Sequence, residues 1–192
     1  MFFILDGVQF FSIGTEISKH FTSKEKISPF NNSKKEFETI IAYGYAQLGQ
    51  RYFAKSTDRA FIDVTVNISD QYYDRTNSIV ISRTPFNFYD KKARINLDLS
   101  LRFGKTFHKN KSLYAGVSMP KISFIHSEED LTASGKVHLG CEFCVARYAS
   151  IFCEAAYKLY LSREPYENLT THSASISLGL RIHGENYYNP EG

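Results

Sequence analysis

Residues 93–105, with the sequence ARINLDLSLRFGK, determine the fold class of this chain. Polar or small residues alternate strictly there with apolar ones, which are Ile95, Leu97, Leu99, Leu101 and Phe103. A β-strand points successive side chains to opposite faces, whereas a helix repeats its faces about every 3.6 residues. The stretch therefore predicts a strand with one apolar face and one polar face.

The same period of two recurs along most of the chain. Four other regular segments lie at residues 59–69, 136–146, 150–162 and 174–182. Less regular segments, at residues 11–18, 38–51 and 113–119, bring the prediction to eight strands. Pro120 interrupts the last of these, and the apolar parity shifts after it, which predicts a bulge. The faces of 38–51 stay open, because apolar residues occur on both parities.

The connections between these segments alternate in length. Long polar ones lie at residues 21–36, 70–92, 126–134 and 163–171, and short ones at 53–58, 106–111 and 146–149. Long links at one end and short turns at the other are typical of a transmembrane β-barrel. We therefore expect an all-β, eight-stranded antiparallel up-and-down barrel, closed by pairing of the first strand (about 8–20) with the last (about 172–183). The residues 1–192 are expected to form one domain, with the barrel at about 7–184 and a short tail at 185–192.

The composition of the polar face indicates which face points inward. It combines small residues with isolated charges of both signs rather than the Lys- and Glu-rich pattern of a solvated surface. Charges in a narrow lumen must be paired, and small neighbours leave room for their long side chains. The predicted lumen charge network comprises Glu16, Asp63, Asp98, Arg102, Lys136, Glu142, Glu154, Lys158 and Arg181. The apolar face would then meet lipid. The alternative is a soluble lipocalin-like barrel that binds a small apolar ligand inside.

The composition excludes several classes of protein. The chain has 192 residues, of which 43% are hydrophobic and 22% charged, so it is neither disordered nor a helical membrane protein. A net charge of +3 without a basic block gives no reason to expect nucleic acid as a partner. The apolar residues 1–5 are read either as the start of a strand or as the remainder of an export leader.

The alternating strands, the long loops and the ending SASISLGLRI at 173–182 resemble the bacterial outer-membrane β-barrel superfamily of OmpA-, OmpX- and opacity-like surface proteins. The resemblance covers about residues 7–184. It implies a small integral protein of the cell outer membrane of a Gram-negative bacterium, surrounded by outer-membrane lipid. It also implies that the four long loops could serve adhesion, surface interaction or envelope integrity through a host or envelope partner. Such proteins usually end on an aromatic residue, whereas His183, Gly184 and a tail follow here.

Two residue clusters are candidates for a catalytic or a metal site. His172 and Ser173, with Glu154, would suit a membrane-embedded lipid hydrolase, but adjacent residues of a strand point to opposite faces. His138 and Glu142 share a face, yet four residues of strand separate them by about 13 Å, too far for one metal ion. We expect no catalytic residue, no cofactor and no metal.

The three cysteines give a test of the strand register. If the turn near Arg147 sets Val145 opposite Ala149, Cys141 faces Cys153 on the apolar side. Directly opposed Cβ atoms lie about 4.5–5.5 Å apart, which is wider than a relaxed disulfide. We expect these two thiols to be neighbours that need not bond, and Cys144 to point into the lumen alone.

Overall fold

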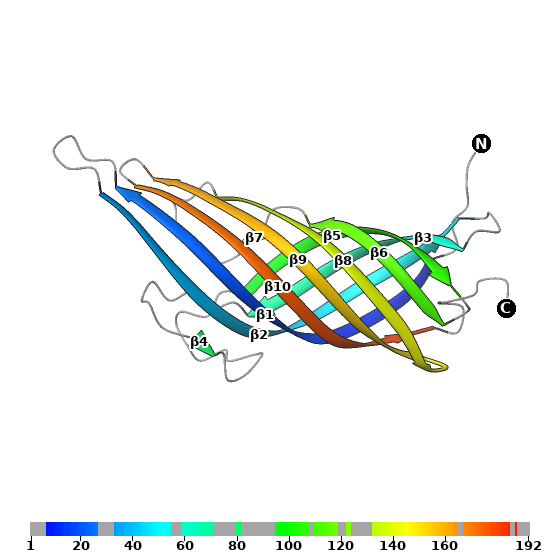
Figure 1. Cartoon of the computed structure of the whole chain (residues 1–192). Coiled ribbons are helices and arrows are strands. Elements are labelled where there is room, and N and C mark those ends of the chain that lie inside the picture. Colours follow the sequence, from blue (N-terminus) through cyan, green and yellow to red (C-terminus); the bar gives the residue numbers. More distant parts are fainter. Residues whose placement is uncertain are drawn as a thin grey trace, which may run out of the picture.

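A computed structural model describes residues 7–26, 33–54, 59–70, 80–81, 95–107, 110–118, 122–123, 132–164, 167–184 and 187. Its eight long strands are β1 (Gly7–Lys26), β2 (Ser33–Phe53), β3 (Ala60–Asp70), β5 (Ile95–Phe107), β6 (Lys111–Ser118), β8 (Thr132–Ala146), β9 (Ala149–Glu164) and β10 (Glu167–His183). Two pieces of two residues, β4 (Val80–Ile81) and β7 (Ile122–Ser123), accompany them (Figure 1). Among the described residues, no helix is long and apolar enough to cross a membrane.

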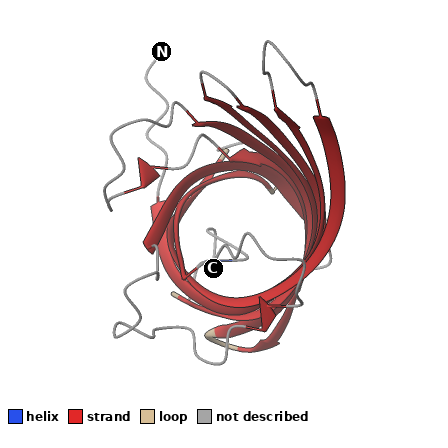
Figure 2. Ribbon diagram, turned by 90° about the vertical axis from the view of Figure 1, so that its left-hand side faces the viewer, coloured by secondary structure: helices blue, strands red, loops and turns tan. Residues whose placement is uncertain are grey.

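The eight long strands form a closed antiparallel barrel. Each pairs with its neighbours in the chain, and β1 pairs with both β2 and β10. Gly14 faces Gly179 across the closing seam, so the first and last strands meet as predicted. Figure 2, which looks along the barrel, shows the complete ring. Because closure leaves no unpaired edge, every long strand has a hydrogen-bonding neighbour on both sides.

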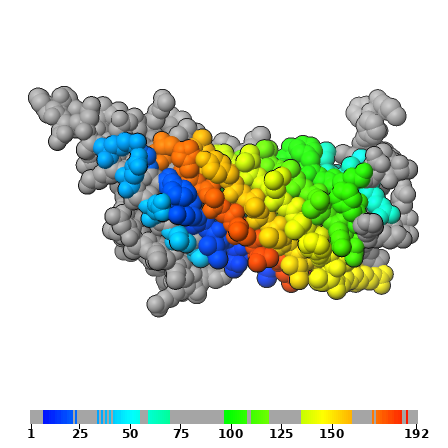
Figure 3. Space-filling view, in the orientation of Figure 1, coloured from blue at the N-terminus to red at the C-terminus, as the bar shows by residue number. Residues whose placement is uncertain are grey.

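The alternating pattern of the sequence places polar residues inside the barrel and apolar residues on its outer surface. Leu139 is 66% exposed on β8, while His138 beside it is buried. The same holds around the ring, since the exposed large hydrophobic residues include Ile17, Leu48, Leu99, Val117, Leu139, Ile176 and Leu178. Figure 3 shows one side of the outer wall. The apolar residues face outward, which excludes the lipocalin-like alternative with its apolar interior.

Three of the four predicted long loops are shorter than expected. β1 continues to Lys26 and β2 begins at Ser33, so most of 21–36 is strand. Similarly, β9 runs to Glu164 and β10 begins at Glu167, which leaves little of 163–171 as a loop. β8 takes up residues 132–134 of the third loop. The prediction was wrong because these segments are polar on both faces, yet polar cross-strand pairs extend an antiparallel ladder above the apolar wall.

The remaining loop predictions fall largely on residues that the structure does not describe. Within 70–92 only β4 is described beyond the end of β3, and it pairs in parallel with β2 at Ile41–Val80. After β6, β7 pairs with β5: Leu97 faces Ile122, whereas Leu101 faces Val117. From Leu97 to Leu101 the chain advances four positions, whereas between their partners Ile122 and Val117 it spans five. This extra residue agrees with the bulge predicted at Pro120.

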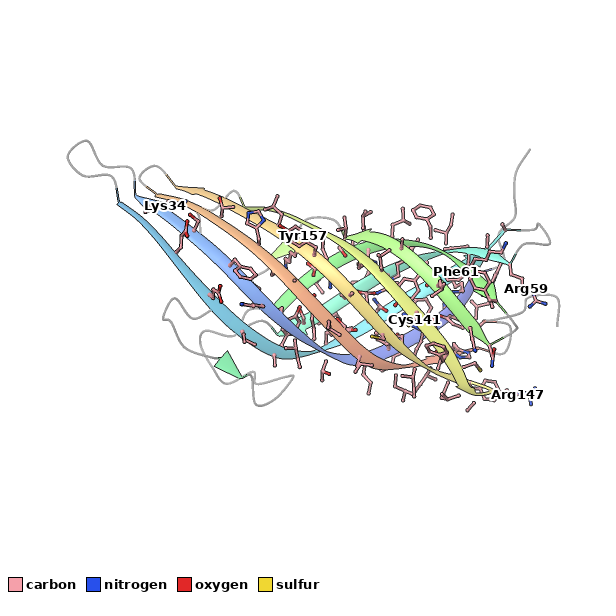
Figure 4. The ribbon with its side chains drawn as sticks, viewed as in Figure 1. Lys34, Arg59, Phe61, Cys141, Arg147 and Tyr157 are labelled. Atoms are coloured by element: carbon pink, nitrogen blue, oxygen red, sulfur yellow. The ribbon has the colours of Figure 1, made fainter. Side chains whose placement is uncertain are left out.

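The cysteine register is confirmed in part. Cys141 faces Cys153 on the outer wall, and both are free thiols (Figure 4). Cys144 is half-buried and packs against the cluster of Phe10 and Tyr187 at one end of the lumen. The expectation that Cys144 is alone was therefore wrong, because a tail residue that the strand pattern did not place occupies this space.

Candidate functional site

Four charged side chains on four strands meet in the lumen, toward the end of the barrel that carries the short turns. Arg51 of β2 forms a two-point ion pair with Asp63 of β3, from Nε to Oδ1 at 2.7 Å and from Nη2 to Oδ2 at 2.9 Å. Arg181 of β10 donates from Nη1 to Glu142 Oε2 of β8 at 2.6 Å, and Arg51 reaches the same oxygen at 3.2 Å. All four are fully buried, so two cations and two anions neutralise one another away from water.

A second cluster lies around Arg102 of β5. Its Nη2 donates to Glu154 Oε2 at 2.8 Å, and its Nη1 donates to the Gln47 side-chain oxygen at 2.9 Å. Arg181 donates to the same Gln47 oxygen at 3.2 Å. One amide oxygen therefore accepts from two guanidinium groups and connects the two clusters.

A third ion pair continues the network along the lumen. Lys136 Nζ lies 2.9 Å from Glu16 Oε2 and 3.8 Å from Glu154 Oε1. Ser177 donates to the same Glu16 oxygen at 3.3 Å, while Ser150 donates to Glu142. The Ser150 hydroxyl thus satisfies the Glu142 oxygen that the two arginines leave open, whereas Ser177 shares the Glu16 oxygen with Lys136.

Aromatic rings fill the space between the guanidinium groups. Arg51 lies over Phe61 at 3.6 Å, and Arg102 lies over Tyr114 at 5.1 Å. Arg181 lies over Phe10 and Phe152, at 4.4 and 5.0 Å. Such contacts are strongest where water is absent.

Glycines make room for these rings. A Cβ atom added at Gly140 would stand 2.2 Å from Tyr114 Cζ, and one at Gly179 would stand 2.4 Å from Phe152 Cζ. The large aromatic side chains of the lumen therefore lie directly over these glycines of the polar face.

The structure brings together seven of the nine predicted lumen charges. Glu16, Asp63, Arg102, Glu142, Glu154 and Arg181 are buried, and Lys136 joins them half-buried. Asp98 and Lys158 are half-buried on the same lumen-facing parity but form no ion pair with another described residue. Both lie nearer the long-loop end of the barrel, because Asp98 precedes Arg102 on β5 and Lys158 follows Glu154 on β9.

Sequence reasoning missed three residues of this network. Arg51 and Gln47 lie on the strand whose faces the pattern left open. Tyr187 belongs to the tail, yet it is fully buried and donates from its hydroxyl to Glu142 Oε2 at 3.1 Å. Gln47 and Arg51 could have been found from the sequence, because they share odd numbering with Tyr43 and Tyr45. The odd positions of 43–51 therefore form the more polar face of this strand.

The candidate hydrolase residues do not come together. His172 is exposed and bonds Tyr157 on the outer wall (2.6 Å from Nδ1 to the hydroxyl), whereas Ser173 is buried inside. His138 accepts a hydrogen bond from Arg102 Nε at 3.3 Å, as part of the lumen network. Among the described residues, no group of three His, Cys, Asp or Glu side chains could hold a metal ion.

A closed ring of antiparallel strands with an apolar outer wall and ion pairs within is an outer-membrane-type transmembrane β-barrel. No family model and no curated protein sequence matches the chain. Solved structures to which the chain is similar include Neisserial surface protein A, at 11% identity and a TM-score of 0.39, over 88% of this chain and 96% of that one.

Two other solved structures are similar in the same way. Ail, the attachment invasion locus protein of Yersinia pestis, matches at 15% identity and a TM-score of 0.30, over 89% of this chain and 98% of that one. OmpT, an outer membrane protein of Vibrio cholerae, matches at 13% identity and a TM-score of 0.30, over 83% of this chain and 46% of that one. The class of this chain rests on its own strand pairing and burial.

Proposed function

We propose that residues 1–192 form a single non-catalytic domain that spans the outer membrane of a Gram-negative bacterium. The carrying observation is the contrast between its two faces. An uncharged apolar wall of this extent would be costly in water, whereas lipid solvates it. Seven lumen charges serve as an internal network of ion pairs that holds the strands together: Glu16, Asp63, Arg102, Lys136, Glu142, Glu154 and Arg181. Asp98 and Lys158 belong to the same polar face, nearer the long-loop end.

The filled lumen argues against a general pore. The fully buried guanidinium groups of Arg51 and Arg181 and the nearly buried one of Arg102 occupy the barrel interior with their aromatic neighbours. A barrel of eight strands has room only for its own side chains. The protein therefore acts through the surfaces that it presents outside the membrane.

The hairpins that extend past the apolar wall are the proposed contact surfaces. β1 and β2 continue as a polar ladder, in which Lys19 pairs with Glu38 at 2.8 Å. Lys34 lies 2.7 Å from Glu36, and this ammonium holds the pKa of the Glu36 carboxyl below its usual value. Exposed charges of both signs suit polar contacts with a host or envelope partner, through residues 21–36, 70–92, 126–134 and 163–171.

Expression behind an export leader tests the membrane assignment. The protein should fractionate with outer membranes, resist extraction by urea, and migrate differently on gels before and after boiling. Trypsin added to intact cells should cut the β1–β2 hairpin, which carries Lys24, Lys26, Lys34 and Lys35. Recovery of the protein as a soluble monomer would contradict the assignment.

Binding by whole cells tests the role of the hairpins. Cells that display the protein should adhere to a host-cell or matrix surface more than cells that display a variant with those four lysines replaced by serine. Equal surface amounts, measured by antibody, make the comparison valid. Equal adhesion by both would overturn the proposed contact role of this hairpin and leave the membrane assignment unaffected.

A further inference from the structure

Tyr187 lies beyond the last strand, yet barrel side chains enclose it completely. β10 ends at His183, and the Tyr187 backbone N–H donates to the Gly184 carbonyl at 3.3 Å. This turn directs the residue back into the lumen, at the end where β1 begins and β10 ends. Residues that follow a terminal strand are ordinarily exposed, so complete burial requires specific contacts.

The phenol hydroxyl group lies between an arginine and a carboxylate. Arg181 Nη1 donates to it at 2.6 Å, and the hydroxyl donates to Glu142 Oε2 at 3.1 Å. A phenol can accept and donate at once, which phenylalanine cannot do. The hydroxyl thus joins the ion pairs of Arg181 and Glu142 without adding a charge to them.

The ring of Tyr187 is held on several sides. It stacks on His183 with centroids 4.3 Å apart and an interplanar angle of 15°, and it meets the Phe10 ring at 5.6 Å and 77°. The Arg51 guanidinium lies 3.9 Å from its centroid and 3.6 Å from that of Phe61. Arg51 therefore contacts an aromatic ring from the barrel wall and another from the tail.

We propose that Tyr187 is a stopper, supplied by the tail of the chain, that closes one end of the lumen. It separates the cluster of Arg51, Glu142 and Arg181 from water at the end of the barrel that carries the short turns. Ion pairs are stronger where water is excluded, so the stopper also strengthens the network. Val8 and Cys144 pack against the Phe10–Tyr187 cluster, which places a natural thiol beside the stopper.

The Cys144 thiol allows a direct test in the refolded full-length protein in lipid vesicles. Cys141 and Cys153 are first replaced by alanine, and a water-soluble charged maleimide is added. Tyr187→Ala should raise the labelling rate of Cys144 about tenfold or more, because two charge-assisted hydrogen bonds and a cation–π contact are lost. Tyr187→Phe, which keeps the ring, should give an intermediate rate. Tyr148→Ala is the control, since Tyr148 is exposed near the same end of the barrel.

Each outcome decides the proposal. Gel migration before boiling reports which variants form barrels, and only these are labelled. Equal labelling of Cys144 in the parent and in folded Tyr187→Ala would overturn the stopper. If Tyr187→Ala does not fold, Tyr187→Phe decides, because it loses both hydroxyl bonds and its rate must exceed that of the parent. An increase in Tyr148→Ala equal to that in the Tyr187 variants would also overturn it.

Discussion

The outer wall and the lumen of this barrel are built from the same strands but obey opposite rules. Ile151 points outward and is 45% exposed, while Phe152 beside it is fully buried and lies under the Arg181 guanidinium. On the wall, an apolar side chain needs no particular neighbour because lipid surrounds it. In the lumen, the buried charged side chains have specific partners at set distances. On the outer wall, any apolar substitution should therefore be tolerated. In the lumen, a substitution should be tolerated only if it keeps both the shape and the charge of the side chain.

The largest expected effect comes from removing a fully buried lumen cation. Arg181→Met leaves the buried Glu142 carboxylate without its 2.6 Å partner, and breaking such a pair costs about 3–5 kcal/mol. The adjacent outward substitution Ile182→Met should cost less than about 1.5 kcal/mol, because it only exchanges apolar side chains. Urea titration in lipid vesicles, followed by gel migration, measures both. Similar losses in the two variants would contradict the contrast between the faces.

A charge placed on the wall should have the next largest effect. Leu139→Arg puts a guanidinium into hydrocarbon, which costs about 2–4 kcal/mol near the middle of a bilayer. Gln50→Arg, near the end of β2 that carries the short turns, should cost about 0–1 kcal/mol because it lies near the interface. The same urea titration compares them, and a cost for Gln50→Arg as large as that for Leu139→Arg would show that depth in lipid is not the cause.

Steric crowding in the lumen should have a smaller effect. Gly179→Ala sets a Cβ atom 2.5 Å from the Ile13 carbonyl oxygen and 2.4 Å from Phe152, and such overpacking costs about 1–3 kcal/mol. Gly135→Ala is the matched control, because nothing lies within 4 Å of its added Cβ. Its stability should stay within about 0.5 kcal/mol of the parent. Equal stability of the two alanine variants would refute the close packing of the lumen.

The smallest effect is expected at the exposed ion pair above the wall. Glu38→Gln removes the partner of Lys19, and both side chains are largely exposed. Surface pairs of this kind contribute about 0–1 kcal/mol. The urea midpoint should therefore change little. A loss comparable to that of Arg181→Met would mean that the polar hairpin carries part of the barrel's stability.

The sequence predicts the barrel because alternation is a local signal that each strand carries by itself. It also predicts seven of the network charges, since an isolated charge on a polar face must be paired in a lumen. Arg51 was missed because β2 departs from the usual pattern of large apolar residues outside and small or polar residues inside. Its outward positions include the small residues Ala42, Gly44 and Ala46, while tyrosines point inward. Tyr187 was missed because its burial depends on a turn and on partners from distant strands, which no local pattern encodes.

The most direct test of the two faces uses adjacent residues of β9. The chain contains no tryptophan, so one introduced residue is a clear fluorescent probe. In vesicles of lipids brominated on their acyl chains, the emission of Ile151→Trp should be strongly quenched. Phe152→Trp, one position along, should stay largely unquenched inside the lumen. Equal quenching of both, or stronger quenching of Phe152→Trp, would contradict a barrel with its apolar face in lipid and its charges within.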